Sequence, residues 1–329
     1  MRVLVTGGTG FVGQHLVRLL HDRTRTIFST YLVKPSSPII GAELLACDLR
    51  NRDQALQIVR YAQPQHIYHL SALSSVIKSF EEARQVWNTN VWGAMNLLDA
   101  VREAAPEARV LLVGSSQCYG QVASRRLPVA EDERLAPTSP YAASKAAAEM
   151  LATQFFHSCA LQVIRTRPFN HTGPGQSAEF VCSDLARQVA EIELGYRSPV
   201  VRIGNIRVKR DFSDVRDVVR AYELLLHRGA AGDVYNVASG RGVSIAEIIK
   251  HLQSYCARRF QVDVEQKRIR SSEVLQVYGS NRKLRRATGW KPEYSLAQTL
   301  HDLYEFWKIA VAADHEKAAH ELDRDKDDR

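Results

Sequence analysis

Two residues that could exchange a proton lie four positions apart, Tyr141 and Lys145. Pro140 precedes them and alanine and apolar positions follow, so the segment 142–157 is expected to be a helix with both side chains on one face. A free tyrosine has a pKa of about 10 and is a poor acid or base at neutral pH. A neighbouring ammonium group stabilises the phenolate and lowers that pKa, so Tyr141 could act as an acid or base. The same pair also occurs by chance on surface helices, so its meaning depends on its surroundings.

A second pattern is the glycine-rich run Gly7-Gly8-Thr9-Gly10-Phe11-Val12-Gly13, between an apolar run at 2–6 and a helical pattern at 13–20. The first glycine permits a tight turn, the middle one lets backbone N–H groups approach a pyrophosphate, and the last lets helix and strand pack closely. A glycine-rich turn without a ligand is the alternative. The strand before it and the helix after it are the context that a dinucleotide-binding loop requires, so we expect a dinucleotide cofactor.

The sequence offers limited information on which dinucleotide is bound. Asp48, just after a strand at 44–47, could accept a hydrogen bond from adenine, although it could also be an ordinary strand-end cap. An acid at the end of the second strand binds the ribose 2′-OH of NAD, whereas a cation favours the 2′-phosphate of NADP. Thr30-Tyr31-Leu32 contains no acid and Lys34 is close by. The expected cofactor is therefore NADPH or NADH, with a slight preference for NADP, and Lys145 could hydrogen-bond its nicotinamide ribose.

Strands and helices alternate along the first half of the chain, and this pattern positions both motifs. Apolar runs predict strands at 2–6, 26–32, 44–47, 66–70, 109–113 and 161–165, and helical spacing predicts helices at 13–20, 53–62, 88–105 and 142–157. Such alternation predicts an α/β fold of the Rossmann type, with a doubly wound parallel sheet. After residue 170 the regular alternation of strands and helices ends, and irregular segments lie between helices predicted at 181–195, 217–227 and 245–255. We expect a cofactor domain at 1–169 plus roughly 202–238, a smaller, partly discontinuous substrate domain at 170–201 and 239–312, and a charged tail at 313–329.

Composition excludes several other classes of protein. Apolar residues make up 45% and charged residues 24% of the chain, and no apolar run is long enough to span a bilayer. The five cysteines are scattered without a CxxC pair, so a zinc site or a disulfide framework is not expected, and neither is any other metal site. The net charge of +8 could suit nucleic acid or an anionic small molecule, but the basic stretches are discontinuous and lack interleaved aromatics. We expect a cytoplasmic protein that binds neither nucleic acid nor membrane.

Taken together, these motifs resemble the extended short-chain dehydrogenase/reductase family. The matching segments are the glycine loop, Asp48-Leu49, His69-Leu70-Ser71-Ala72, Asn88-Thr89-Asn90, Ser115-Ser116 with Tyr119-Gly120, and Tyr141 with Lys145. The resemblance implies a catalytic role for Ser115, which would hydrogen-bond the reacting oxygen, beside Tyr141 and Lys145. It implies a homodimer built from the helices at 86–105 and 142–157. It also implies that the cofactor contacts Gly7, Gly10, Phe11, Val12, Asp48, Leu49, Leu70, Ser71, Ala72, Asn90, Tyr141, Lys145, Pro168 and Phe169.

Four segments of the second half carry a closer resemblance, at 167–176, 200–205, 210–217 and 270–274. They look most like the GDP-4-keto-6-deoxy-D-mannose reductases, which are close to the GDP-mannose 4,6-dehydratases. This resemblance implies that Arg210 and Arg270 neutralise a diphosphate, a role that suits guanidinium groups. It further implies that Glu273 holds the guanosine ribose and that Asn170 holds the sugar or adjacent phosphate. Phe180, Val181 and Arg187 would lie near the base. Arg210 could instead be a surface ion-pair partner of Asp211 or Asp214, and Ser271 replaces the proline that is usual in relatives.

The chemistry of the two reactions differs at one position. A 4,6-dehydratase must move a proton beside the sugar, which needs an ionisable group, and the dehydratases resembled carry Glu two residues after the catalytic Ser/Thr. This chain has Gln117 there, and an amide cannot shuttle the proton. We therefore expect an enzyme that uses NAD(P)H to reduce the C4 keto group of a GDP-4-keto-6-deoxyhexose to a GDP-6-deoxyhexose such as GDP-D-rhamnose. The alternatives are a nucleotide-sugar dehydratase or epimerase that recycles its cofactor and, more remotely, a non-catalytic NAD(P)-sensing protein.

Overall fold

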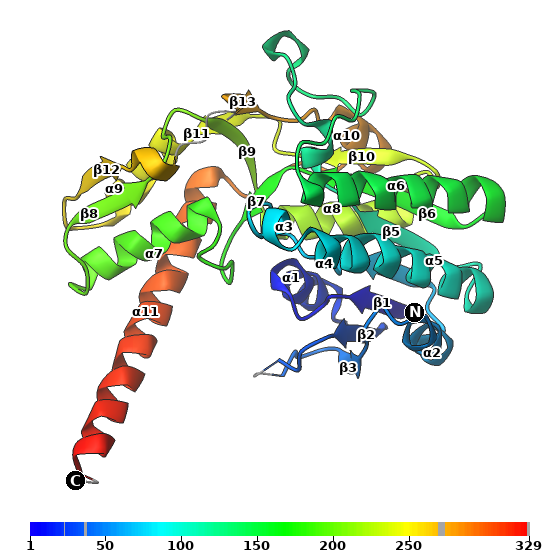
Figure 1. Cartoon of the computed structure of the whole chain (residues 1–329), viewed down its shortest axis with the longest axis horizontal. Helices are drawn as coiled ribbons and strands as arrows, with labels where there is room; N and C mark the ends of the chain where they lie inside the picture. The colour runs from blue at the N-terminus through cyan, green and yellow to red at the C-terminus, as the bar shows by residue number, and fades with distance from the viewer. Residues whose placement is uncertain (23, 36–37, 269–273, 328–329) are drawn as a thin grey trace.

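A computed structural model describes residues 1–22, 24–35, 38–268 and 274–327 of the chain. The molecule has a larger and a smaller lobe, which lie side by side in Figure 1. The larger lobe is built on β1 (Arg2–Thr6), β2 (Thr26–Tyr31), β3 (Glu43–Ala46), β4 (His66–His69), β5 (Arg109–Val113), β6 (Gln162–Pro168) and β10 (Val234–Val237). These strands form one parallel sheet in the order β10-β6-β5-β4-β1-β2-β3. The order reverses direction after β3, which is the doubly wound topology that the alternation predicted.

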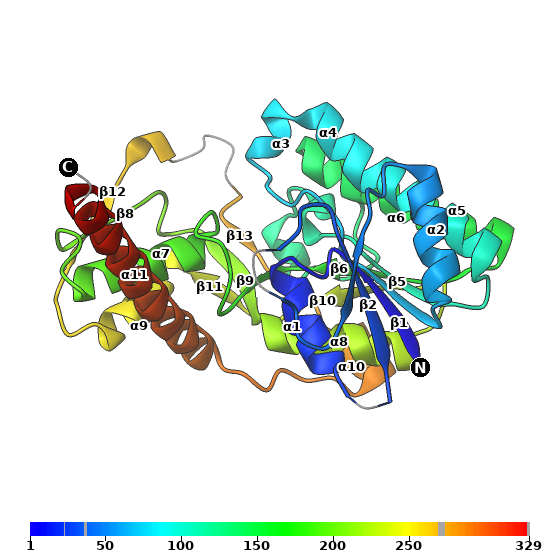
Figure 2. The same cartoon turned by 90° about the horizontal axis from the view of Figure 1, so that it is seen from below.

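Helices cover both faces of this sheet, because its strands are apolar on both sides. On β1 the alternate residues Val3 and Val5 pack on one face while Leu4 packs on the other. Leu4 faces α2 (Arg52–Ala62), α5 (Gly93–Ala104) and α6 (Pro140–Cys159). The valines face α1 (Phe11–Leu20), α8 (Val215–Arg228) and α10 (Arg282–Thr288). Figure 2 shows the two helix layers on opposite sides of the strands. The predicted fold class is confirmed.

The smaller lobe has its own core, built from short strands and three helices. Its four-stranded sheet contains β7 (Asn170–Thr172), β9 (Lys209–Asp214), β11 (Gly242–Ser244) and β13 (Gln276–Val277), and β8 (Val200–Ile203) pairs with β12 (Gln261–Val264). The helices α7 (Val181–Glu193), α9 (Ile245–Tyr255) and α11 (Leu296–Asp327) pack around them. The division of the chain into domains stays a prediction. Because β9 pairs with strands of the smaller lobe, the segment of chain that returns to the cofactor domain would begin near residue 215 rather than near 202.

The segment predicted as one helix at 88–105 begins differently in the structure. Helical structure starts earlier, with α3 (Lys78–Glu81) and α4 (Ala83–Trp87), and a π-helical turn at Asn88–Trp92 links α4 to α5. The Asn90 side chain lies on this turn. It accepts a bond from the Leu73 N–H (2.9 Å) and donates to the Ser144 hydroxyl on α6 (2.9 Å). On this π-helical turn the Asn90 side chain points inward and connects the loop after β4 to α6. Such turns tend to occur at functional sites.

Acid should weaken the fold through His66 on β4. The side chain is buried, and burial lowers the pKa of His66 to about 4, helped by the charges of His227, Arg109 and Arg25. Because the folded pKa lies below the ordinary value of 6.5, the stabilisation is complete above about pH 6.5 and is lost as the pH falls toward 4. Urea unfolding at pH 7 and pH 5 should show that His66 accounts for a loss of about 2 kcal/mol. His66→Leu should reduce that loss, and an unchanged pH dependence in this variant would contradict the assignment.

No helix among the described residues is long and apolar enough to cross a membrane. The last helix, α11, packs against α7 and α9 near its start and then extends away from the body of the molecule toward the C-terminus (Figure 1). The stretch predicted as a charged tail from 313 continues this helix as far as Asp327.

Candidate active site

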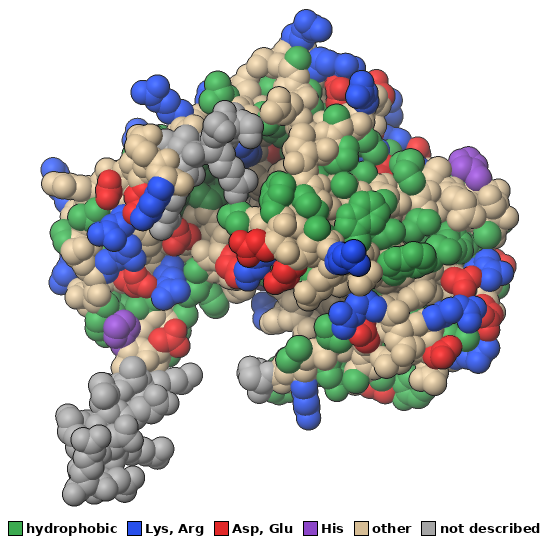
Figure 3. Space-filling model, viewed as in Figure 1, with side chains coloured by type: hydrophobic (Ala, Val, Ile, Leu, Met, Phe, Trp, Pro, Cys, Tyr) green, Lys and Arg blue, Asp and Glu red, His purple; other side chains and the backbone are tan. Residues whose placement is uncertain are grey.

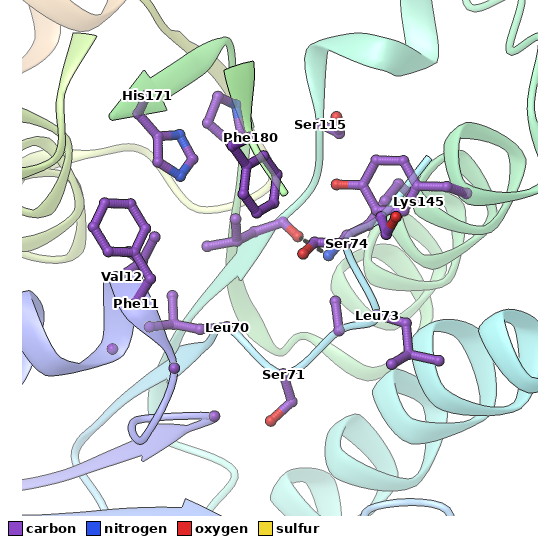
Figure 4. Close-up of a pocket in the computed structure, with 18 of the residues that line it drawn as sticks. Phe11, Val12, Leu70, Ser71, Leu73, Ser74, Ser115, Lys145, His171 and Phe180 are labelled. Atoms are coloured by element: carbon purple, nitrogen blue, oxygen red, sulfur yellow. Dashed lines mark hydrogen bonds between the residues drawn. The ribbon is translucent and has the colours of Figure 1, made fainter. Parts of the chain in front are cut away.

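A cavity of about 720 Å³ lies at the carboxyl ends of the strands of the large sheet, where ligands bind in open α/β folds. Segments that follow each of the strands β1 to β6 line it. The smaller lobe adds residues 170–172, Gln176 and residues 179–182. Figure 4 shows Phe11 and Val12 of the first helix on one side, Ser115 and Lys145 on the opposite side, and His171 and Phe180 above. One cavity therefore contains both sequence motifs.

The glycine loop after β1 fits a dinucleotide pyrophosphate. Gly7 has φ of +70°, a conformation that other residues rarely adopt. A Cβ on Gly13 would lie 2.5 Å from the Gly7 carbonyl oxygen and from Gly8 Cα, so the helix could not approach the strand as it does. The N-cap of α1 is Gly10, which has no side chain that could cap the first N–H groups of the helix. The first N–H groups of α1 therefore face the cavity, together with the positive end of the helix dipole, as an anionic cofactor requires.

The predicted catalytic residues meet at the far end of the cavity. Ser139 caps α6 by accepting a bond from Ala142 N–H (3.1 Å), and Pro140 follows, so Tyr141 and Lys145 sit in the first two turns. Ser115 lies just after β5. Burial raises the pKa of Tyr141 to about 12, and a hydrogen bond with Ser115 acts in the opposite direction. The phenol is therefore protonated at neutral pH and can act as an acid.

Lys145 makes a contact that the sequence did not predict. Its ammonium donates a 2.7 Å bond to the Val113 carbonyl, and Lys145 is not among the groups that shift the pKa of Tyr141. The lowering of the tyrosine pKa by this lysine stays a prediction. Burial lowers the pKa of Lys145 to about 8, so the side chain still carries a positive charge at pH 7. The lysine links the end of β5, which carries Ser115, to the helix that carries Tyr141.

A buried polar network holds this end of the sheet. The Glu149 carboxylate on α6 accepts two bonds from Arg167 on β6, at 2.9 and 2.6 Å, and neither residue is more than 5% exposed. Arg167 also donates to the Tyr119 hydroxyl (2.9 Å), which in turn donates to Asn236 on β10 (2.7 Å). The network ties α6, β6, β10 and the turn after Ser115 together, which fixes Ser115 relative to Tyr141.

Most of the predicted cofactor residues border the cavity. The exception is Asn90, whose side chain is buried and bonds Leu73 and Ser144 instead. It acts on the loop after β4 that lines the cavity, rather than facing the cavity itself. Asp48 borders the cavity, but its carboxylate is held by the Arg50 guanidinium at 2.7–3.0 Å. The predicted cofactor residues that line the cavity are Gly7, Gly10, Phe11, Val12, Asp48, Leu49, Leu70, Ser71, Ala72, Tyr141, Lys145, Pro168 and Phe169.

The predicted substrate residues divide into three groups. Ser115, Asn170, Phe180 and Val181 line the cavity. Arg187 and Arg210 do not, and Arg270 and Glu273 lie outside the described residues. Arg187 forms an i,i+4 ion pair with Glu191 (2.8 Å) on an exposed face of α7. Arg210 lies on β9 and donates to the Lys209 carbonyl (2.9 Å) rather than pairing with Asp211. Asp211 is buried and accepts bonds from Ser239, Gly240 and Gly279.

Several cavity residues were not predicted. Ser74 and His171 face the cavity in Figure 4, and Gln176 and Arg50 also line it. The His171 ring stacks on Phe11 of the cofactor loop, with centroids 6.2 Å apart, and burial lowers the pKa of His171, so the ring is neutral at pH 7. Ser74 and Arg50 could have been found from the rule that residues just after the strands of a parallel sheet meet at one edge. Among the described residues, no group of three or more His, Cys, Asp or Glu side chains could hold a metal ion.

Comparison with known proteins gives consistent matches over nearly the whole chain. The GDP-mannose 4,6 dehydratase family model matches residues 4–303. GDP-6-deoxy-D-mannose reductase of Pseudomonas aeruginosa is 36% identical over 94% of this chain and 98% of its own length. Human GDP-mannose 4,6 dehydratase is 27% identical over 91% of this chain and 89% of its own.

Solved structures match equally well. The structure of RMD from Pseudomonas aeruginosa complexed with NADPH superposes with a TM-score of 0.83 at 34% identity, covering 94% of this chain and 100% of that one. The UDP-glucose 4-epimerase of Thermus thermophilus in complex with NAD also gives a TM-score of 0.83, at 26% identity, covering 94% of this chain and 99% of that one.

Proposed function

We propose that this chain, which belongs to the GDP-mannose 4,6-dehydratase family, is an NAD(P)H-dependent reductase of the C4 keto group of a GDP-4-keto-6-deoxyhexose. The product would be a GDP-6-deoxyhexose such as GDP-D-rhamnose, an intermediate for deoxysugar biosynthesis. The resemblance seen in the sequence motifs is confirmed at the level of the family, and the chain is an NAD(P)-dependent enzyme, as its relatives are. The cofactor prediction of NADPH or NADH is likewise confirmed as NAD(P).

The observation that carries the proposal is the absence of a suitable carboxylate beside the catalytic residues. Among the described residues that line the cavity, only Asp48 and Glu179 are acidic. Asp48 is held by Arg50, and the half-exposed Glu179 forms a 2.6 Å ion pair with Lys78. Gln117 lines the cavity two residues after Ser115, where a dehydratase of the kind resembled would have glutamate. Dehydration needs a group there that can gain and lose a proton, whereas reduction does not.

The residues at this end of the cavity suit a ketone reduction. When bound, the reduced nicotinamide would supply the hydride that the C4 carbonyl carbon accepts. Ser115 is placed to donate a hydrogen bond to the carbonyl oxygen and to hold it near Tyr141. Tyr141 is protonated at neutral pH and would give its proton to the oxygen as negative charge develops there. Lys145 would stabilise the resulting phenolate with its positive charge and hold the cofactor ribose.

An assay of cofactor oxidation tests the proposal. Purified protein would be mixed with NADPH and GDP-4-keto-6-deoxymannose, and the loss of reduced nicotinamide absorbance would be followed. We expect oxidation that is stoichiometric with the keto sugar and none with GDP-mannose alone. Conversion of GDP-mannose to a keto sugar without added NADPH would instead identify a dehydratase, the activity for which the family model is named.

The roles of the predicted substrate residues are proposals, and the structure supports them to different extents. Asn170, Phe180 and Val181 are supported by their position in the cavity wall beside Ser115. We propose the same diphosphate role for Arg210 and Arg270 as the family resemblance implies, with Glu273 at the guanosine ribose. Arg187 receives no support from its position, because its guanidinium pairs with Glu191 outside the cavity. The smaller lobe as a whole would then be the substrate domain, and the larger lobe the cofactor domain. We place the enzyme in the cytoplasm, which suits its five free cysteines.

A homodimer is supported by an exposed apolar surface on the larger lobe. Ile77, Phe80, Trp87, Trp92 and Met150 are all at least 40% exposed and lie on or next to α3, α4, the π-helical turn and α6. Figure 3 shows apolar side chains gathered over these helices. Patches of this kind mark interaction sites on soluble proteins.

The dimer can be broken at Trp92 if this surface is the interface. We expect sedimentation equilibrium to give a dimer for the wild-type protein and a monomer for Trp92→Glu, because the substitution buries an unpaired charge in the interface. Tyr196→Glu changes an exposed aromatic on the smaller lobe (49% exposed, against 59% for Trp92), and this variant should remain dimeric. A dimeric Trp92→Glu variant would place the interface elsewhere.

A further inference from the structure

We propose that a cavity beside α10, away from the active site, binds the phosphate group of a small molecule. This α10 cavity has a volume of about 440 Å³ and is lined by Pro128, Ala130, Glu131, Ser280, Arg282, Lys283 and Arg286. It shares no lining residue with the active-site cavity, so a ligand here would be additional to cofactor and substrate. Its volume is within the range of small-molecule sites.

Two arginines give the α10 cavity its positive charge. Arg282 and Arg286 are four residues apart on α10, so their side chains extend from the same face of the helix. Both are exposed, and the side chain of neither has an ion-pair or hydrogen-bond partner among the residues that the structure describes. The third cation, Lys283, is already paired with Asp233 at 2.8 Å. The charge available to attract a ligand therefore comes from the two arginines.

A buried hydroxyl group adds a neutral donor to the same wall. The Ser280 side chain is only 8% exposed, although it lines the cavity. Its oxygen accepts a 3.4 Å bond from the Arg282 N–H, and its own O–H has no acceptor among the described residues. A serine hydroxyl can donate one hydrogen bond while its oxygen accepts another. The O–H of Ser280 is therefore available to an anion held by the arginines.

This set of donors suits a phosphate better than a carboxylate. A single guanidinium group already binds both oxygens of a carboxylate, whereas a phosphate has three terminal oxygens and can accept bonds from several donors at once. The only acid in the wall, Glu131, is engaged elsewhere, because its Oε1 accepts a 2.8 Å bond from the Asn236 N–H. Pro128 and Ala130 make another part of the wall apolar, which suits the organic part of a phosphate ester.

The backbone around the α10 cavity is held in place by the fold. The Val129 N–H donates to the Tyr278 carbonyl (2.9 Å), and the Ser280 N–H donates to the Val129 carbonyl (2.7 Å), which joins the two segments of the wall. Leu284, between the two arginines in the sequence, is 0% exposed and anchors α10 in the core of the larger lobe. Binding therefore requires the ordering of two arginine side chains and little change in the backbone.

Calorimetric titration with the active-site cavity already filled tests the proposal. The protein would be saturated with NADPH and GDP at about 0.1 M salt, which partly screens diffuse attraction, and then titrated with pyrophosphate. We expect one pyrophosphate to bind per chain. Arg282→Gln and Arg286→Gln should each weaken that binding by about tenfold, the effect of losing a charge-assisted hydrogen bond. Both arginines are exposed, so neither substitution disturbs the core.

Arg285→Gln is the matched control, because Arg285 is an exposed arginine on the same helix that does not line the cavity. It removes the same charge and should change pyrophosphate binding by less than about threefold. Equal weakening in Arg285→Gln and Arg286→Gln would overturn the proposal, since the ligand would then be attracted by surface charge alone.

The absence of saturable binding below about 1 mM pyrophosphate would also overturn it. Parallel titrations with inorganic phosphate and glucose 1-phosphate separate two sources of the phosphate group. Tighter binding of glucose 1-phosphate would support an organic phosphate that packs on the apolar wall, and equal binding would support the free ion in the same site.

Discussion

Replacement of Tyr141 by phenylalanine should lower kcat for keto-sugar reduction by about 10²–10⁴-fold, the usual contribution of a positioned proton donor. The side chain is buried at the catalytic end of the cavity and hydrogen-bonded to Ser115, and its raised pKa keeps it protonated. Phenylalanine keeps the ring and removes the hydroxyl group, and with it the proton that the C4 oxygen needs. Steady-state rates with NADPH and the keto sugar would measure the loss.

The same variant should still bind its ligands, which separates chemistry from folding. NADPH affinity, measured by nicotinamide fluorescence, should change by less than about threefold, since a single hydroxyl contact to the cofactor is lost. A variant that retains more than about a tenth of wild-type kcat would contradict the assignment of Tyr141 as the proton donor. A variant that no longer binds NADPH would show that the phenol mainly holds the cofactor.

Removal of Glu149 should cost about 3–5 kcal/mol of unfolding free energy, the usual effect of leaving one partner of a buried ion pair behind. The carboxylate is 0% exposed and is the bidentate partner of Arg167, which is 5% exposed. Glu149→Ala would leave the guanidinium buried with only the Tyr119 hydroxyl and the Glu131 carbonyl as partners. Urea unfolding at pH 7 would measure the change.

Two controls identify the cause of that loss. The double variant Glu149→Leu/Arg167→Leu should be less destabilised than Glu149→Ala, because it removes the buried Arg167 charge together with its partner. Arg165, which lies 3.8 Å from the Glu149 carboxylate, keeps its bonds to Thr153 and Gly232 in both variants. Glu103→Gln removes an acid that pairs on the surface with Arg52 and Arg60 and should cost less than about 1 kcal/mol. A double variant that is less stable than the single one would mean that packing, and not the buried charge, governs the loss.

The large sheet could be predicted because its signals are local. Each strand from β1 to β6 contains at least two consecutive apolar residues, and the glycines at positions 7, 10 and 13 mark one turn between a strand and a helix. The order of the strands and the handedness of their connections then bring Ser115, Tyr141 and the glycine loop to one edge. The sequence missed β10, which has four residues and gains its stability from pairing with β6 far along the chain.

The substrate side was harder to predict because it depends on pairings that leave little trace in the sequence. The strands β7, β11 and β13 have two or three residues each, and they are defined by their partner β9 rather than by periodicity. Long polar side chains add a second difficulty, since several partners are within reach. Arg187 reaches Glu191 one helical turn away, and Arg50 reaches Asp48 across a tight turn. Which contact forms is decided by three-dimensional packing.

The difference between Asn90 as predicted and as observed illustrates the same point. The sequence motif placed it at the cofactor, whereas the structure buries it between the loop after β4 and α6. A π-helical turn changes the direction of a side chain by a large angle, and no regular helical spacing anticipates it. Asn90 still serves the site, because the loop that it holds contains Leu73 and Ser74 in the cavity wall.

The most direct test of the central claim is to follow the transferred hydride with NADPH deuterated at both C4 positions of the nicotinamide. The enzyme would be incubated with the labelled cofactor and GDP-4-keto-6-deoxymannose, and the sugar product analysed by NMR and mass spectrometry. We predict one deuterium at C4 of a GDP-6-deoxyhexose, with one equivalent of oxidised cofactor released for each product. An unlabelled product formed while the cofactor stays reduced, or a keto product formed from GDP-mannose, would contradict the reductase account and indicate a cycle in which the cofactor is regenerated.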